Sequence, residues 1–186
     1  MPQILSGEKI SALAITEPSG GSDVAALKTK AVRDGDNYIV SGEKTFITSG
    51  IRADYYTVAV RTDPNTKGAN GISMLLIDAH SEGITKSKLD KMGWWASDTA
   101  HLHFDNVRVP ARNLLGAENM GFFVIMNNFN MERFFLAASS YGYALVCYEE
   151  ALDWAKQRQT FGKRLIDHQV VRHKLVDMAT RLTSTH

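Results

Sequence analysis

Residues 15–23 have the residue types of a small-ligand receptor, and they read Ile-Thr-Glu-Pro-Ser-Gly-Gly-Ser-Asp. The proline donates no backbone hydrogen bond, and the two adjacent glycines allow backbone angles that other residues avoid. Such a stretch can direct several N–H groups and the hydroxyls of Thr16 and Ser22 toward one point, which suits a phosphate or the polar edge of a ring. The plainer interpretation, which these residues alone favour, is a surface turn in which Ser22 or Asp23 caps a short helical turn over 24–27.

Further motifs follow this stretch along the chain. They read Gly-Glu-Lys-Thr-Phe-Ile-Thr-Ser-Gly at 42–50, Lys-Met-Gly at 91–93, Ser-Asp-Thr at 97–99, Phe-Asp-Asn-Val-Arg-Val-Pro at 104–110, Glu-Arg at 132–133, Arg-Gln-Thr-Phe-Gly-Lys at 158–163 and His-Gln at 168–169. In content, order and spacing, from about Leu5 to the end, the sequence resembles the acyl-CoA dehydrogenase family of flavoproteins. Within that family its motifs are most similar to those of the isovaleryl and long-chain branch.

The resemblance implies an FAD site built from three segments. In the family, the segment like residues 13–22 lines the flavin, with a threonine like Thr16 close to the isoalloxazine ring. The segment like 46–48 packs an aromatic side chain and a hydroxyl beside that ring, and residues like 158–161 reach the adenosine and pyrophosphate on a neighbouring subunit. Arginine suits a pyrophosphate because its planar guanidinium can bond two oxygens at once. The residues expected to bind FAD are Leu13, Ile15, Thr16, Gly21, Ser22, Phe46, Ile47, Thr48, Arg158, Thr160, Phe161, His168 and Gln169.

Two of these segments also have plainer interpretations. Without the family, Phe46 is best taken as an ordinary core residue on a strand. Several members carry tryptophan there, so the indole N–H donor is missing in this chain. Arg158 and the lysines around it also fit an ordinary helix C-terminus, because basic side chains there complement the helix dipole.

Glu132 is the candidate catalytic base. Removing a proton from the carbon next to a thioester carbonyl requires a base held above that carbon, and a carboxylate in dry, apolar surroundings suits this work. Phe129, Phe134 and Phe135 provide such surroundings. In the isovaleryl and long-chain branch the base is the glutamate directly before the arginine that Arg133 resembles, whereas in other branches it lies later in the chain. The alternative is a solvated helix glutamate.

The resemblance further implies an acyl-CoA substrate and a protein acceptor for its electrons. A residue like Arg133 contacts the CoA portion or supports the pocket, and Asn130 stands where several members have an aspartate that faces the substrate. The residues expected near the substrate are Ser22, Thr62, Asn130 and Arg133. By the same resemblance we expect an electron-transfer flavoprotein as acceptor, a role in fatty acid β-oxidation, and a homotetramer built as a dimer of dimers.

Composition excludes several other classes of protein. The 21 Lys and Arg against 20 Asp and Glu give a formal net charge of +1, so there is no electrostatic case for nucleic acid. The single cysteine, Cys147, excludes an internal disulfide framework and suits a reducing compartment. With no apolar run near the ~20 residues of a membrane span and no secretory signal, bacterial cytoplasm or mitochondrial matrix is expected. His101 and His103 share a strand face without a third ligand, so no metal site is predicted.

The pattern of the chain places these motifs on a β-rich part followed by helices. Strands are expected at 29–32, 38–40, 44–48, 55–60, 72–77, 84–89, 101–104 and 107–109. Many short strands between turn signals predict an antiparallel barrel or sandwich. After Gly116, apolar residues recur at three- and four-residue steps, which predicts a helix over about 119–158, ended by Gly162, and a second helix from near Asp167.

The expected fold is therefore α+β. Residues 1–116 form a β-barrel domain, and 117–186 form a long helical hairpin, half of a four-helix bundle. Two amphipathic helices hide only part of each other's apolar stripe, so further helices or another chain are needed. By resemblance the sequence is part of a longer enzyme. A related flavin oxidase that reduces oxygen, and a non-catalytic binding or assembly module, stay open as alternatives.

Overall fold

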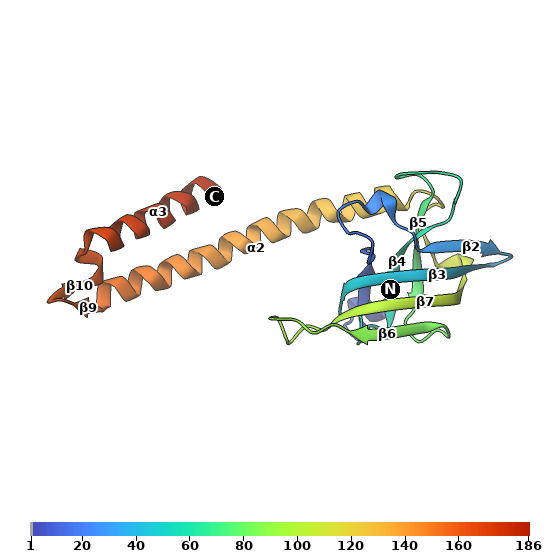
Figure 1. Ribbon diagram of the computed structural model, residues 1–186, viewed down its shortest axis with the longest axis horizontal. Coiled ribbons are helices and arrows are strands. Elements are labelled where there is room, and N and C mark those ends of the chain that lie inside the picture. Colours follow the sequence, from blue (N-terminus) through green and yellow to red (C-terminus); the bar gives the residue numbers. More distant parts are fainter. Residues whose placement is uncertain (1) are drawn as a thin grey trace. The chain divides into compact units, whose positions relative to one another are not determined.

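The computed structural model describes residues 2–186, which form two compact units (Figure 1). The first unit extends to Met126 and the second runs from Asn127 to His186. Among the described helices, none is both long enough and apolar enough to cross a lipid bilayer.

The first unit is built on one eight-stranded sheet. Its strands are β1 (Ser11–Ala14), β2 (Lys30–Asp34), β3 (Asn37–Thr48), β4 (Tyr55–Arg61), β5 (Ile72–Asp78), β6 (Ile84–Lys88), β7 (Thr99–Pro110) and β8 (Leu114–Leu115). They lie in the order β6-β7-β3-β2-β4-β5-β8, and β1 pairs with β4 off this path. The β1–β4 and β2–β4 pairs are parallel and the others antiparallel. Short helices α1 (Pro2–Leu5), η1 (Val24–Ala26) and η2 (Ala111–Asn113) complete the unit. The α+β prediction, with its β-rich first part, is confirmed.

The β2–β3 hairpin follows from its turn residues. Asp34 pairs with Asn37, which leaves Gly35 and Asp36 as the two-residue loop. Gly35 has φ 57°, in the left-handed region that a two-residue hairpin loop requires at its first position. The strands expected at 29–32 and 38–40 are therefore present and paired as β2 and β3.

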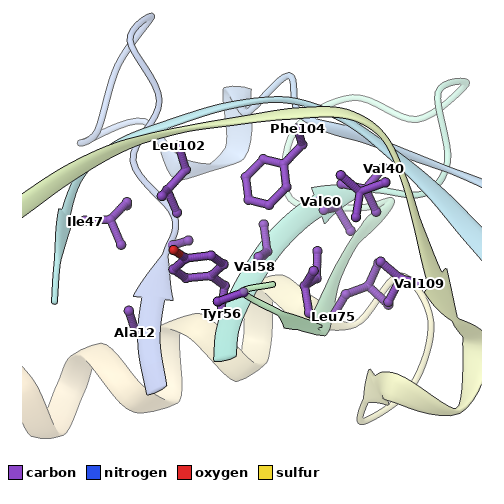
Figure 2. Packing of buried hydrophobic residues seen from close by; sticks show 14 of the residues in the cluster. Ala12, Val40, Ile47, Tyr56, Val58, Val60, Leu75, Leu102, Phe104 and Val109 are labelled. Carbon is purple, nitrogen blue, oxygen red and sulfur yellow. The ribbon is translucent and has the colours of Figure 1, made fainter. Parts of the chain in front are cut away.

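The core of the first unit lies between strands that face each other across its interior (Figure 2). Leu102 and Phe104 of β7 point toward Tyr56 and Leu75 of β4 and β5, and all four are fully buried. The rings of Tyr56 and Phe104 meet edge to face, with centroids 6.4 Å apart and planes at 87°. This is the geometry that aromatic pairs prefer. The core fixes the facing strands, and through them the loops at their ends.

Replacing Gly42 by alanine is expected to lower the free energy of unfolding by about 2–3 kcal/mol. Gly42 has φ 146°, and a Cβ there would lie 2.7 Å from Thr29 Cα, a backbone atom that cannot rotate away. Urea unfolding followed by circular dichroism measures the loss. Gly35→Ala is the matched control, because φ is 57° there but no atom lies within 4 Å of the new Cβ. If both variants lost the same stability, the clash with Thr29 would have no effect.

The second unit is a helical hairpin. Helix α2 (Gly121–Gln157) begins in the first unit and continues into the second, and α3 (Gln169–Thr185) runs back beside it (Figure 1). Between them lie β9 (Gln159–Thr160), β10 (Lys163–Arg164) and η3 (Leu165–Asp167). The predicted glycine cap is wrong. Helix α2 already ends at Gln157, and Phe161 and Gly162, with φ 51° and 76°, form the turn of the small β9–β10 hairpin instead. Two positive φ angles at the centre of a two-residue loop are those of a type I′ turn.

An apolar groove runs between α2 and α3. Its volume is about 480 Å³, and it is lined by Ala137, Ser140, Tyr141, Ala144 and Cys147 from α2 and Met178, Arg181, Leu182 and Thr185 from α3. Large apolar side chains along α2, among them Phe134, Phe135 and Trp154, are also exposed. The hairpin thus presents more apolar surface than its two helices cover, as predicted.

Candidate functional site

The 15–22 segment leaves the carboxyl end of β1 and folds into a tight turn. Glu17 N–H donates to Gly20 O at 3.1 Å, and Gly20 N–H donates to Glu17 O at 3.0 Å. Ile15 is buried, whereas Gly21 and Ser22 are exposed. The expected short helical turn is present as the three-residue η1 with Asp23 at its N-cap position, but the side chain of Asp23 makes no capping hydrogen bond.

A backbone hydrogen bond joins this turn to β3. Thr45 N–H donates to Thr16 O at 2.9 Å, so Thr16 lies directly beside the strand that carries Phe46 and Thr48. The β3–β7 register shifts between Lys44 and Ile47, which marks a bulge. Segments that are about thirty residues apart in sequence are therefore neighbours, and two of the three groups expected to bind FAD come together.

The bulge turns Phe46 outward. Phe46 has φ 59°, unusual for a bulky residue, and its side chain is 69% exposed, whereas Ile47 is buried. Strained residues of this kind cluster at functional sites. The plainer interpretation of Phe46 as a core residue is therefore wrong.

Phe46→Gly is expected to stabilise the ligand-free protein by about 1 kcal/mol relative to Phe46→Ala, because glycine relieves the strain of a positive φ that alanine keeps. Both variants lose the exposed ring, so both should lose the same affinity for a ligand that stacks on it. Thermal unfolding measures the first effect and ligand titration the second. Equal stability of the two variants would mean that the backbone relaxes once the ring is removed.

The residues around this bulge fit a flat ring with a polar edge. The exposed face of Phe46 offers an apolar surface, and Thr48 and Ser22 carry exposed hydroxyls. A Cβ on Gly21 would lie 3.1 Å from Thr16 Cγ2, so a side chain at Gly21 would crowd the turn on the Thr16 side. An apolar ring face beside hydroxyl groups and a backbone without a side chain at Gly21 suits the isoalloxazine ring of a flavin.

A buried ion pair under the turn was not predicted. Lys44 Nζ lies 2.9 Å from Glu17 Oε1, and the side chains of Lys44 and Glu17 are 0% and 5% exposed. The sequence contained one indication that Lys44 is buried. Lys44 follows Tyr38 and Val40 at the strand period of two, and this places it on the same inward face of β3. A lysine at such a position requires a buried partner.

Burial and charge act against each other on this pair. Burial lowers the pKa of Lys44 to about 8, although the Glu17 carboxylate acts in the opposite direction. Burial alone would raise the pKa of Glu17, but the charge of Lys44 and hydrogen bonds from Thr29 and Lys44 outweigh it, so that the pKa lies below its ordinary value. The carboxylate is therefore ionised at neutral pH.

Thr62, expected near the substrate, follows β4 and is held by its neighbours. Its Oγ1 lies 2.6 Å from Ser73 Oγ and 2.7 Å from Asn119 Oδ1, just before the start of α2. The preceding residue, Arg61, donates hydrogen bonds to five backbone carbonyls, of Ala25, Leu27, Thr66, Gly68 and Asn70. The hydroxyl of Thr62 is therefore fixed in place by Ser73 and Asn119.

Glu132, Asn130 and Arg133 lie on exposed positions of α2 in the second unit. Asn128 donates a side-chain hydrogen bond to Glu132 Oε1. The guanidinium of Arg133 lies 5.7 Å from the centre of the Phe129 ring, and its Nη1 is 3.4 Å from Asn130 Oδ1. Glu132 and Phe135 line the same shallow hollow. The expected carboxylate and its aromatic neighbours therefore lie on one stretch of helix.

The third expected group is gathered around the β9–β10 hairpin. Thr160 Oγ1 lies 3.4 Å from His168 Nε2, and the rings of Phe161 and His168 are 6.3 Å apart. Phe161 is 97% exposed, and Arg158 and Gln169 are exposed beside it. An aromatic face, a guanidinium and an imidazole are thus available to a ligand here. This arrangement suits an aromatic base with an attached phosphate.

No metal centre accompanies these residues. Among residues 2–186, no three His, Cys, Asp or Glu side chains are placed to hold a metal ion. His101 and His103 instead flank the carboxylate of Glu43, at 3.8 Å and 3.4 Å.

Comparisons with known proteins match both parts of the chain. The family described as acyl-CoA dehydrogenase, middle domain, matches residues 12–107, and the family described as acyl-CoA dehydrogenase, C-terminal domain, matches 119–186. The mouse long-chain specific acyl-CoA dehydrogenase, mitochondrial, is 40% identical over 100% of this chain and 44% of its own length.

Solved structures agree with these matches. A probable acyl-CoA dehydrogenase from Mycobacterium abscessus is 51% identical, with a TM-score of 0.93 over 98% of this chain and 48% of that one. A glutaryl-CoA dehydrogenase from Mycobacterium smegmatis in complex with FADH2 is 33% identical, with a TM-score of 0.90 over 99% of this chain and 46% of that one. The chain thus spans less than half the length of each of these relatives.

Proposed function

The chain belongs to the acyl-CoA dehydrogenase family, and we propose that its protein oxidises an acyl-CoA thioester to a trans-2-enoyl-CoA with FAD as cofactor. The observation that carries this proposal is the match of residues 12–107 to the family's middle domain. The position of Thr16 beside β3, the strand that carries the exposed ring of Phe46, supports it, because a hydroxyl and an aromatic face on neighbouring segments suit a flavin ring. In this proposal residues 1–116 are the β-barrel domain and 117–186 the first two helices of the helical domain.

Each group of residues has a role in the proposed reaction. Thr16, Gly21, Ser22, Phe46 and Thr48 hold the flavin ring in the first unit, and Leu13, Ile15 and Ile47 support them. The adenosine and pyrophosphate of the FAD bound by a neighbouring subunit contact Arg158, Thr160, Phe161, His168 and Gln169. Along the acyl-CoA lie Arg133, Asn130, Ser22 and Thr62. When bound, FAD accepts the hydrogen that leaves the β-carbon as hydride.

Glu132 is the proposed base for the α-proton. The carboxylate lies on α2 one residue before Arg133 and lines a hollow with Met131 and Phe135. Apolar neighbours keep water from competing for the proton once substrate covers the carboxylate. The role rests on the resemblance of the motifs to those of the long-chain and isovaleryl branch of the family.

The test uses the protein encoded by the full reading frame that contains these residues. We expect it to purify yellow, and its flavin absorbance to bleach anaerobically when an acyl-CoA is added. A colourless protein that cannot be reconstituted with FAD would overturn the proposal. Release of hydrogen peroxide in step with turnover would indicate the oxidase instead.

The acceptor, assembly and compartment belong to the same proposal. We infer an electron-transfer flavoprotein as acceptor, a homotetramer, and a place in bacterial cytoplasm or mitochondrial matrix, where fatty acid β-oxidation uses such enzymes. The exposed apolar side chains of α2 support assembly, because leaving them in water costs about 25 cal/mol per Å². Sedimentation of the full-length protein tests the oligomeric state, and residues 1–186 alone should self-associate and bind FAD weakly.

A further inference from the structure

Glu17 and Lys44 form a buried junction that joins separate segments of the first unit. Lys44 Nζ donates to Glu17 Oε1 and to Ile15 O, each at 2.9 Å. The carboxylate of Glu17 also accepts hydrogen bonds from Lys28 N–H at 2.6 Å and Thr29 N–H at 2.8 Å. One lysine and one glutamate therefore tie together the exit of β1, the tight turn after it, the start of β2 and the middle of β3.

Every polar atom of this junction is satisfied within the chain. Among the described residues, no buried side-chain nitrogen or oxygen lacks a hydrogen-bond partner. Removing two charges from water nevertheless has a large desolvation cost, and apolar side chains of similar volume often give equal or greater stability. Stability alone is therefore a poor account of this pair, and the fixed geometry that its directional bonds impose is a better one.

The junction lies next to the residues that face the proposed ring. Glu17 directly follows Thr16, and Lys44 stands two residues before Phe46, at the start of the β3 bulge. The Thr45 N–H to Thr16 O bond of 2.9 Å crosses the same gap. A shift of the Glu17 carboxylate would move the Thr16 turn relative to the outward ring of Phe46.

We propose that Glu17 and Lys44 are positioning residues that set the distance between the 16–22 turn and the Phe46 bulge, and thereby the affinity for FAD. The side chains of Lys44 and Glu17 are 0% and 5% exposed, so neither offers a face on which the ring could rest. Their effect passes through Thr16 on one side and Phe46 on the other. The inference rests on the proposed function, because it takes the ring between these two segments to be a flavin.

Glu17→Asp tests the inference with the charges kept. Aspartate retains the ion pair but is one methylene shorter, so the turn must move toward Lys44 to keep its bonds. We expect the dissociation constant for FAD to rise at least tenfold, and the visible circular dichroism of the bound flavin to change. Apoprotein is titrated with FAD, and quenching of flavin fluorescence is followed. The exposed pair of Asp34 and Arg108 supplies the control, and Asp34→Glu should leave both readouts unchanged.

A double variant, Glu17→Leu with Lys44→Met, removes both charges together. We expect its thermal midpoint to fall, because Lys28 N–H, Thr29 N–H and Ile15 O lose their partners, and the FAD dissociation constant of its folded fraction, measured below that midpoint, to rise at least tenfold. Wild-type protein that binds no FAD would contradict the proposed function itself. Wild-type binding together with unchanged affinity in Glu17→Asp would overturn the positioning role, as would an affinity loss fully explained by the fraction of unfolded protein. Glu17→Asp decides the question alone if the double variant does not fold.

Discussion

Lys44→Ala is expected to lower the free energy of unfolding by about 3–5 kcal/mol, the largest loss of stability among the substitutions considered for the first unit. Truncation leaves the Glu17 carboxylate, 5% exposed, without its cation and removes the donor to Ile15 O. A buried charge without a partner retains the full cost of its desolvation. Urea unfolding at pH 7, followed by circular dichroism, measures the loss.

An exposed ion pair provides the matched control. Arg108 Nη1 lies 2.9 Å from Asp34 Oδ2, the same separation as in the buried pair, but the two side chains are 60% and 57% exposed. Arg108→Ala should therefore cost less than about 1 kcal/mol. If Lys44→Ala and Arg108→Ala lowered the free energy of unfolding equally, burial of the Glu17–Lys44 pair would have no energetic consequence.

The loss in Lys44→Ala should also depend on pH. The pKa of Glu17 in the folded wild type lies below its ordinary value of 4.5, so Glu17 contributes stability above that value and loses it as pH falls through the folded pKa. In the variant, protonation of the Glu17 carboxylate removes its charge and therefore the desolvation cost of that charge. The difference between the two proteins should therefore be largest near neutral pH and shrink in acid.

Glu132→Gln is expected to reduce the rate of flavin bleaching by acyl-CoA about 10²–10⁴-fold, the usual contribution of a general base. Glutamine has the size of glutamate and keeps one acceptor oxygen, but its amide cannot accept the α-proton. The affinity for FAD should stay unchanged, because the proposed flavin contacts lie elsewhere. Anaerobic stopped-flow absorbance of the full-length protein measures the rate.

Glu149 supplies the control for this substitution. It is an exposed glutamate on the same helix, and Glu149→Gln should leave the bleaching rate unchanged. A wild-type rate in Glu132→Gln would show that another residue is the base. A loss of bound FAD in that variant would instead indicate that Glu132 supports the fold of the site.

Much of the architecture follows from local pattern. The three- and four-residue apolar period after Gly116 predicted a helix over about 119–158, and α2 runs from Gly121 to Gln157. Strands were expected at 29–32 and 38–40, and β2 and β3 pair there around Gly35 and Asp36. The motifs from Thr16 to Gln169 likewise identified the family. Each of these features depends on residues that are close together in the chain.

Features that depend on distant contacts were not accessible in this way. The strand period places Lys44 on the inward face of β3, but its partner Glu17 is 27 residues away and is brought there only by the turn after β1. Without the family, Phe46 was assigned to the core of a strand, whereas the bulge between Lys44 and Ile47 breaks the alternation and turns the ring outward. Gly162 was expected to end the helix, yet pairing of β9 with β10 uses it as a hairpin turn.

The sequence by itself thus determined the family, the order of elements and the residue types of the site. Only the tertiary structure decided which side chains are buried as an ion pair and which ring faces outward. The physical reason is that a bulge or a buried charge is stable only when a distant segment supplies the compensating bond. Local propensity contains no information about that partner.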